Sequence, residues 1–182
     1  MEKKNISSVK RITLVGMMAA VVCVVTLFRF PLLGSKVHFA NTMCVLSGLL
    51  LGPVSGGLAA GLGSAIYDVL LGGYGAVEAL ITFATKFAMA WAAAMLVRTA
   101  GERTMLRVIV ASVIGAFTYM ALYMCKTWIF QTFVYGYARD AVWATLLSKA
   151  PGSFINACLA SVASPILYAA LKPSLKKMGL PW

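Results

Sequence analysis

Long apolar stretches alternate with short polar breaks along the chain, and this alternation predicts six helical segments. The apolar stretches cover about residues 12–30, 39–51, 54–71, 76–97, 106–130 and 153–171. A helix needs about 20 apolar residues to cross the roughly 30 Å hydrocarbon core of a bilayer. The second stretch is short, so it is either extended by its loop or crosses only partly. Because no alternation typical of a membrane β-barrel is visible, we predict an all-α integral membrane protein.

The composition agrees with this prediction. Of 182 residues, 61% are hydrophobic and 12% are charged, whereas an ordinary soluble domain is roughly half apolar and about a quarter charged. A soluble fold of this length has too little interior for so much apolar surface, so we predict one six-helix membrane domain. The first apolar stretch lacks a small-residue cleavage site and is interpreted as a retained span. The four Cys stand singly in apolar stretches and are interpreted as packing residues.

Basic residues gather at one end of the predicted bundle. The net charge is +11, and most of the 16 Lys and Arg precede the first segment, follow the sixth or flank the break between the fourth and fifth. Because they stand at the ends of apolar stretches, they indicate membrane topology and not nucleic-acid binding. The positive-inside rule then places both termini in the cytoplasm. The outer loops are expected at residues 31–38, 72–75 and 131–152.

Three charged residues surround the second of these outer loops. Glu78 stands in the first turn of its segment, where the helix dipole favours an anion, whereas Asp68 stands in a last turn, where the dipole opposes it. Lys86 lies about 15 Å further along the same helix, and a central lysine costs about 2.5–3.5 kcal/mol on insertion scales. Glu78, Thr82 and Lys86 share one helix face. Lys86 therefore faces either a polar pocket or an acidic partner such as Asp68.

The fifth and sixth segments add further polar candidates. The stretch "YMCKTWIFQTFVYGYARD" places Lys126 and Trp128 among several aromatic side chains. Aromatic residues favour the membrane interface, but together with a few polar groups they also suit a small planar ligand. Ser153 and Asn156 lie one helical turn apart near the outer end of the sixth segment, where an amide is expected to find a hydrogen-bond partner.

No enzymatic signature is present, and we predict that the protein is not an enzyme. The only histidine, His38, is expected in an outer loop, and no serine stands in a GxSxG elbow. A Walker motif is absent, so the chain does not hydrolyse a nucleotide by itself. A single histidine does not make a metal site, and no cofactor is expected.

The segment "VHFANTMCVLSGLLLGPVSGGLAAGLGSAIYDVLLGG" resembles the second and third helices of the substrate-binding S components of energy-coupling factor (ECF) transporters. The resemblance is to the branch with hydroxymethylpyrimidine-, pyridoxine- and riboflavin-type members. "ITFATK" and "APGSFINA" are similar to further family segments, and Gly16 and Ala20 stand where the first helix carries an Ala-xxx-Ala coupling motif. The chain departs from the family pattern at Asn41 and near Lys126, where acidic residues are expected.

This resemblance implies a membrane-embedded, high-affinity subunit that captures a B-vitamin or related micronutrient from outside a prokaryotic cell. It also implies partners, namely a membrane coupling protein and two cytosolic ATPases, and a toppling motion in the bilayer. The loop between the first two helices is expected to cover the pocket. Gly16 and Ala20 either dock the coupling protein or pack internally. The predicted substrate-binding residues are His38, Asn41, Asp68, Tyr74, Glu78, Lys86, Lys126, Trp128, Ser153 and Asn156.

The alternative is a self-sufficient carrier or channel, for instance a proton-coupled one that uses Glu78 and Lys86. The sequence disfavours it, because no inverted internal repeat is visible and intramembrane carboxylates are few. A purely structural membrane scaffold is a third possibility, against which the buried charge of Lys86 argues.

Overall fold

The computed structural model describes residues 8–32, 35–98 and 104–177. Within these residues the chain forms six α-helices, a short β-hairpin and one π-helical turn. In chain order they are α1 (Ser8–Leu27), β1 (Arg29–Leu32), β2 (Ser35–His38), α2 (Ala40–Leu51), α3 (Pro53–Leu70), α4 (Ala76–Arg98), α5 (Met105–Ile129), η1 (Phe130–Val134) and α6 (Arg139–Lys177).

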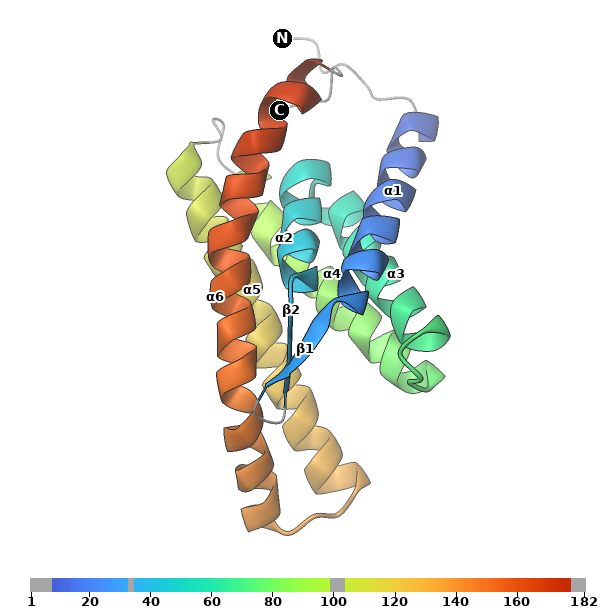
Figure 1. Cartoon of the computed structure of the whole chain (residues 1–182), viewed down its shortest axis with the longest axis vertical. Coiled ribbons are helices and arrows are strands. Elements are labelled where there is room, and N and C mark those ends of the chain that lie inside the picture. Colours follow the sequence, from blue (N-terminus) through green and yellow to red (C-terminus); the bar gives the residue numbers. More distant parts are fainter. Residues whose placement is uncertain (1–7, 33–34, 99–103, 178–182) are drawn as a thin grey trace.

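Successive helices run up and down through one bundle. The start of α1 and the end of α6 lie at one end, whereas the β-hairpin, the α3–α4 turn and the α5–α6 connection lie towards the other (Figure 1). The short α2 packs against α3, α4 and α6 in the middle of the bundle. Nine of its 12 residues are buried. At about 18 Å it is shorter than the bilayer core, and its neighbours shield it.

Four helices are long and apolar enough to cross a membrane, within the part of the chain that the structure describes. They are residues Ser8–Leu27, Ala76–Val97, Met105–Val134 and Arg139–Pro173. This agrees with a mostly helical membrane protein. The count of six spans and the cytoplasmic placement of the termini stay predictions.

Glycines allow the helices to approach closely. A Cβ atom added to Gly48 of α2 would lie 2.2 Å from the carbonyl oxygen of Ala90 in α4. One added to Gly56 of α3 would lie 2.4 Å from the carbonyl oxygen of Ser47. Both distances fall far inside van der Waals contact with backbone atoms, so neither position accepts a larger residue without moving a helix. The glycine-rich helix α3 therefore packs closely against α2 at Gly56.

The first expected outer loop folds as an antiparallel hairpin, which adds a strand pair to the predicted all-α fold. Arg29 pairs with His38 and Leu32 with Ser35. Pro31 lies in β1, where its missing N–H is tolerated because the sheet has only two strands, both of them edges. The hairpin leads the chain from the end of α1 back to the start of α2.

The prediction of an outer loop at residues 131–152 is wrong for most of its length, because most of these residues are helical. Helix α6 begins at Arg139, and η1 extends α5 to Val134. The sixth segment, expected at residues 153–171, is therefore the inner part of a 39-residue helix. The predicted segment begins just after Pro151, and a proline usually marks a helix boundary because it removes one helical hydrogen bond. Here it lies inside α6.

Candidate functional site

A cavity of about 370 Å³ opens among the β-hairpin and helices α2 to α6. Its volume falls in the range of small-molecule sites. Nine of the ten predicted substrate-binding residues line it, namely His38, Asn41, Asp68, Tyr74, Glu78, Lys86, Lys126, Ser153 and Asn156. Trp128 does not line it. That side chain is 44% exposed and packs edge-on against Phe133, with ring centroids 5.7 Å apart.

Lys86 is a buried cation in the wall of this cavity. Its side chain is 3% exposed, and its ammonium donates a hydrogen bond to Oδ1 of the buried Asn41. The same Nζ lies 3.6 Å from the centroid of the Tyr119 ring, a cation–π contact. The structure gives Lys86 and Asp68 no salt bridge within the described residues. The short contacts of Lys86 are therefore to neutral groups, and Asp68 acts on its charge only from beyond salt-bridge distance.

Asp68 belongs to a separate contact on the α3–α4 side. Its carboxylate accepts a hydrogen bond from Thr82, which lies one helical turn from both Glu78 and Lys86. The Arg29 guanidinium, also in the cavity wall, lies 4.6 Å from the centroid of the Tyr67 ring. The β-hairpin therefore brings a cation to the side of the cavity that carries Asp68.

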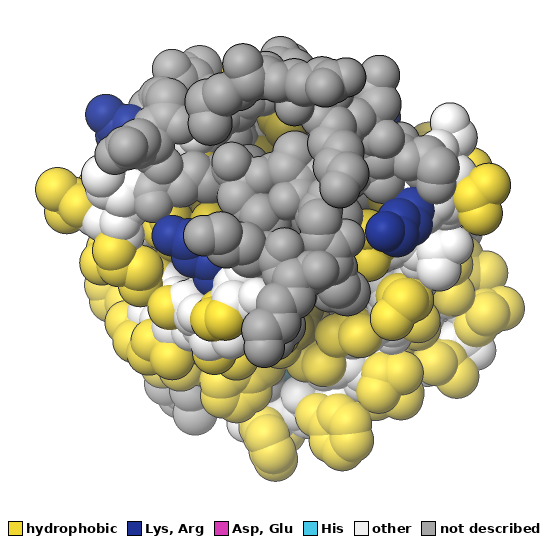
Figure 2. Space-filling model, turned by 90° about the horizontal axis from the view of Figure 1, so that it is seen from above, with side chains coloured by type: hydrophobic (Ala, Val, Ile, Leu, Met, Phe, Trp, Pro, Cys, Tyr) yellow, Lys and Arg dark blue, Asp and Glu magenta, His cyan; other side chains and the backbone are white. Residues whose placement is uncertain are grey.

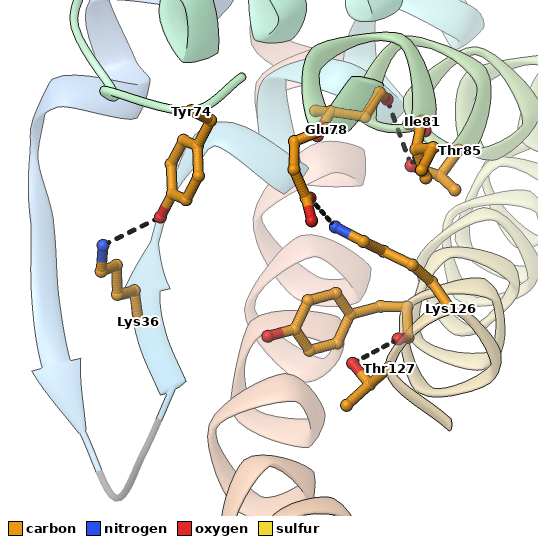
Figure 3. A network of polar contacts seen from close by, with 9 residues as sticks. Lys36, Tyr74, Glu78, Ile81, Thr85, Lys126 and Thr127 are labelled. Atoms are coloured by element: carbon orange, nitrogen blue, oxygen red, sulfur yellow. Dashed lines mark hydrogen bonds and ion pairs between the residues drawn. The ribbon is translucent and has the colours of Figure 1, made fainter. Parts of the chain in front are cut away.

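A second group of charges lies between the α3–α4 turn, α5 and the hairpin (Figure 3). Lys126 forms a salt bridge with Glu78. Across the same space, Lys36 of β2 donates a hydrogen bond of 3.1 Å to the phenolic oxygen of Tyr74. Lys149 of α6 also lines the cavity, with its Nζ 5.8 Å from the centroid of the Tyr123 ring.

Asn156 joins the hairpin to α6. Its Oδ1 accepts a hydrogen bond of 2.9 Å from the backbone N–H of His38, and its Nδ2 donates one of 2.7 Å to the carbonyl oxygen of Lys36. Residues two apart on a strand present backbone groups on the same edge. The side-chain amide of Asn156 therefore bonds the two backbone groups of β2 that a neighbouring strand would otherwise bond. Asn156, at 5% exposure, holds the hairpin over the cavity.

His38 is uncharged at neutral pH. Burial, more than the nearby charges of Lys86, Arg29 and Lys36, lowers the pKa of this imidazole from its ordinary 6.5 to about 3. Its Nδ1 is buried without a hydrogen-bond partner. A neutral imidazole beside the cavity offers a ligand one donor and one acceptor. Among the residues that the structure describes, no three His, Cys, Asp or Glu side chains are grouped to hold a metal ion.

Sequence reasoning missed several lining residues, of which the tyrosines of α5 are the most informative. Tyr119 and Tyr123 stand seven and three positions before Lys126, so all three share one helix face. Their rings stack with centroids 6.1 Å apart. Their spacing from Lys126 is the signal in the sequence that could have identified them. The other lining residues not predicted are Thr26, Arg29, Ser35, Lys36, Ala40, Ser64, Thr82, Thr127 and Lys149.

Comparison with known proteins places the chain in a family. Residues 5–173 match the family described as ECF-type riboflavin transporter, S component. A solved chain described as "Structure and mechanism of the S component of a bacterial ECF transporter" superimposes with a TM-score of 0.71 at 19% identity, over 92% of this chain and 98% of that one. This likeness shows the fold. No curated protein sequence matched significantly. Because the family match extends over most of its length, the chain belongs to the family of ECF-type riboflavin transporter S components.

Proposed function

We propose that the protein is the membrane-embedded substrate-binding subunit of an ECF importer and binds a vitamin-like micronutrient in the 370 Å³ cavity. The family is a transporter family and not an enzyme class. The observation that carries the proposal is this cavity, because its wall concentrates the charged residues of an otherwise apolar bundle. Uncompensated charges at such depth are costly in a membrane protein and usually serve a ligand or an ion.

The hairpin end of the bundle faces the outside in this proposal. Seen from the opposite end, the charged side chains visible among the described atoms are Lys and Arg, with hydrophobic flanks (Figure 2). The described helix ends there carry Lys10, Arg11, Arg107 and Lys172. An excess of Lys and Arg is typical of a cytoplasmic face. The ligand then enters from outside, and the hairpin covers it.

Docking of the membrane coupling protein is proposed for α1. Gly16 and Ala20 are both exposed, and a Cβ atom built on Gly16 meets nothing within 4 Å. Ala19, which is turned about 100° around the helix from Ala20, is buried. Small residues allow two helices to approach closely. This arrangement favours an external partner over internal packing, which was the alternative that the sequence left open. Two cytosolic ATPases complete the proposed complex.

Binding by the isolated chain tests this function. We expect the purified protein to retain a small molecule from rich growth medium, which mass spectrometry of the denatured sample identifies. Titration of that molecule into emptied protein, without any partner, should show one saturable site. Tagged protein should also co-purify with the coupling protein and ATPases when these are co-expressed. A chain that binds no small molecule, or that never associates with the module, contradicts the proposal.

A further inference from the structure

The cavity contains more cations than carboxylates. Only Asp68 and Glu78 oppose five basic side chains in its wall, which are Arg29, Lys36, Lys86, Lys126 and Lys149. Within the described residues, Lys126–Glu78 is the single salt bridge. The hydrogen bonds and ring contacts given for the other cations are to neutral groups. Asp68 and Glu78 also attract them at longer range, but two carboxylates do not balance five positive charges. A neutral ligand leaves this excess in place, whereas an anionic ligand offsets it.

We propose that the ligand carries a phosphate or carboxylate group and that Lys36, Lys126 and Lys149 bind this group. The inference rests on the proposed function and specifies the chemistry of its substrate. The three lysines come from β2, α5 and α6. Lys149 interacts electrostatically with Lys126, Glu78 and Tyr74, and Lys36 bonds Tyr74. Glu78 thus interacts with Lys126 and Lys149, and Tyr74 links Lys36 to them. Figure 3 shows Lys36 and Lys126 of this three-lysine group.

Physical reasons favour an anion at this position. Charges of like sign repel strongly in a partly buried cavity, where the effective dielectric constant is lower than in water. Ammonium groups donate their strongest hydrogen bonds to anionic oxygens. Lys126 and Glu78 are 22% and 30% exposed at the side chain, so a ligand reaches them and is still shielded from bulk solvent.

The same geometry connects anion binding with closure of the hairpin. Lys36 belongs to β2, which Asn156 ties to α6. An anion between Lys36 and Lys149 adds a charge-assisted link between the same two elements. The uncharged part of the ligand then lies along the wall formed by the stacked rings of Tyr119 and Tyr123. The proposed ligand is therefore a ring compound with an anionic substituent.

Pairs of probes that differ in one anionic group test whether the site prefers an anionic ligand. They are riboflavin and riboflavin 5′-phosphate, pyridoxine and pyridoxine 5′-phosphate, and nicotinamide and nicotinate, each titrated by calorimetry into the full-length protein in detergent. We expect the charged member of at least one pair to bind about tenfold to a hundredfold more tightly, the range for hydrogen bonds to charged groups. The phosphate pairs and the carboxylate pair distinguish the two kinds of anion.

Variants locate the effect at the lysine group. Lys149→Met should weaken the preferred charged probe about tenfold or more, with a much smaller effect on its neutral counterpart, and Lys149→Arg should restore most of the loss. Glu78→Gln should strengthen binding of the charged probe, since it removes the competing carboxylate. Lys172→Met, an exposed lysine of α6 outside the cavity, is the matched control and should bind like the wild type.

The proposal is overturned if no charged probe binds better than its neutral counterpart, or if Lys149→Met weakens both members of a pair equally. Failure of the anion site and failure of the proposed function give different results. A neutral probe that binds tightly and is taken up only with the ECF module contradicts the anion site and leaves the function intact. A preference for charged probes, with uptake that needs no module, supports the anion site and contradicts the function.

Discussion

Replacing Lys86 by Met removes a buried charge and keeps a side chain of similar length. In the structure this ammonium donates a hydrogen bond to Asn41 and lies 3.6 Å from the Tyr119 ring centroid, at 3% exposure. If the ammonium also bonds the ligand, its loss should cost about 1.5–3 kcal/mol of binding free energy, or roughly tenfold to a hundredfold in affinity.

The effect of Lys86→Met on stability is expected to be small, because two contributions oppose each other. Leaving Oδ1 of Asn41 unpaired costs about 1–3 kcal/mol, and losing the ring contact costs about 0.5–2 kcal/mol. Against this, removing a charge from the bundle interior regains about 2.5–3.5 kcal/mol on insertion scales. Binding should therefore fall while the melting temperature stays near that of the wild type.

Calorimetric titration with the ligand identified by mass spectrometry, and a melting curve for each variant, measure the two quantities. The double variant Lys86→Met with Asn41→Leu should be more stable than Lys86→Met alone, because no amide is left unpaired. Asp68→Asn should not stabilise Lys86→Met, since Lys86 bonds Asn41 and not Asp68. Wild-type affinity in Lys86→Met would remove this residue from the binding site. Rescue by Asp68→Asn would show that an ion pair was its role.

Three further predictions concern docking, the hairpin and pH. Gly16→Leu with Ala20→Leu should abolish module-dependent uptake and leave ligand binding by the isolated chain intact; uptake that persists would make the exposed face of α1 an ordinary lipid contact. Ligand should slow hydrogen exchange over residues 35–41, and Asn156→Ala should speed exchange there in the empty protein by removing two hydrogen bonds to β2; unchanged exchange in both cases would separate the hairpin from the cavity. The segment 31–41 was expected as the lid, and residues 33–34 of it lie outside the described part. Ligand affinity should fall as pH drops below about 6.5. The pKa of His38 is lowered to about 3 with the hairpin packed as in this structure, so a hairpin that opens to admit ligand exposes the imidazole, which then takes up a proton at higher pH. The slope is at most about 1.4 kcal/mol per pH unit, and His38→Gln should flatten it.

The sequence predicted the helices well where an apolar stretch and a helix coincide. α2 to α4 begin and end within about one residue of the predicted stretches, since Gly and Pro stand at their ends. The start of α6 was missed because apolarity reports contact with lipid and not helical conformation. Residues 139–152 carry charges and Pro151 within a continuous helix. Neighbouring helices in a bundle tolerate a proline that an isolated helix would not.

The site was predictable where burial makes a residue costly. Lys86, Asp68 and Glu78 stand out because a charge in an apolar stretch needs a reason. Tyrosines carry no such signal, since they also favour the membrane interface. Trp128 shows the opposite error, because it was predicted to bind substrate and does not line the cavity. It follows Lys126 by two positions, which places the two about 200° apart around α5, so Trp128 faces outwards. The contacts of Asn156 with β2 depend on the hairpin, which the pattern did not predict.

Transport by reconstituted vesicles tests the central claim most directly. The ligand that co-purifies with the protein is offered, in labelled form, to vesicles that contain this chain alone or together with the coupling protein and ATPases. The account predicts that label accumulates only when the complete module and internal ATP are present, and that the double substitution at Gly16 and Ala20 prevents it. Accumulation by the chain alone, driven by a proton gradient, would contradict the assignment as the substrate-binding subunit of an ECF importer.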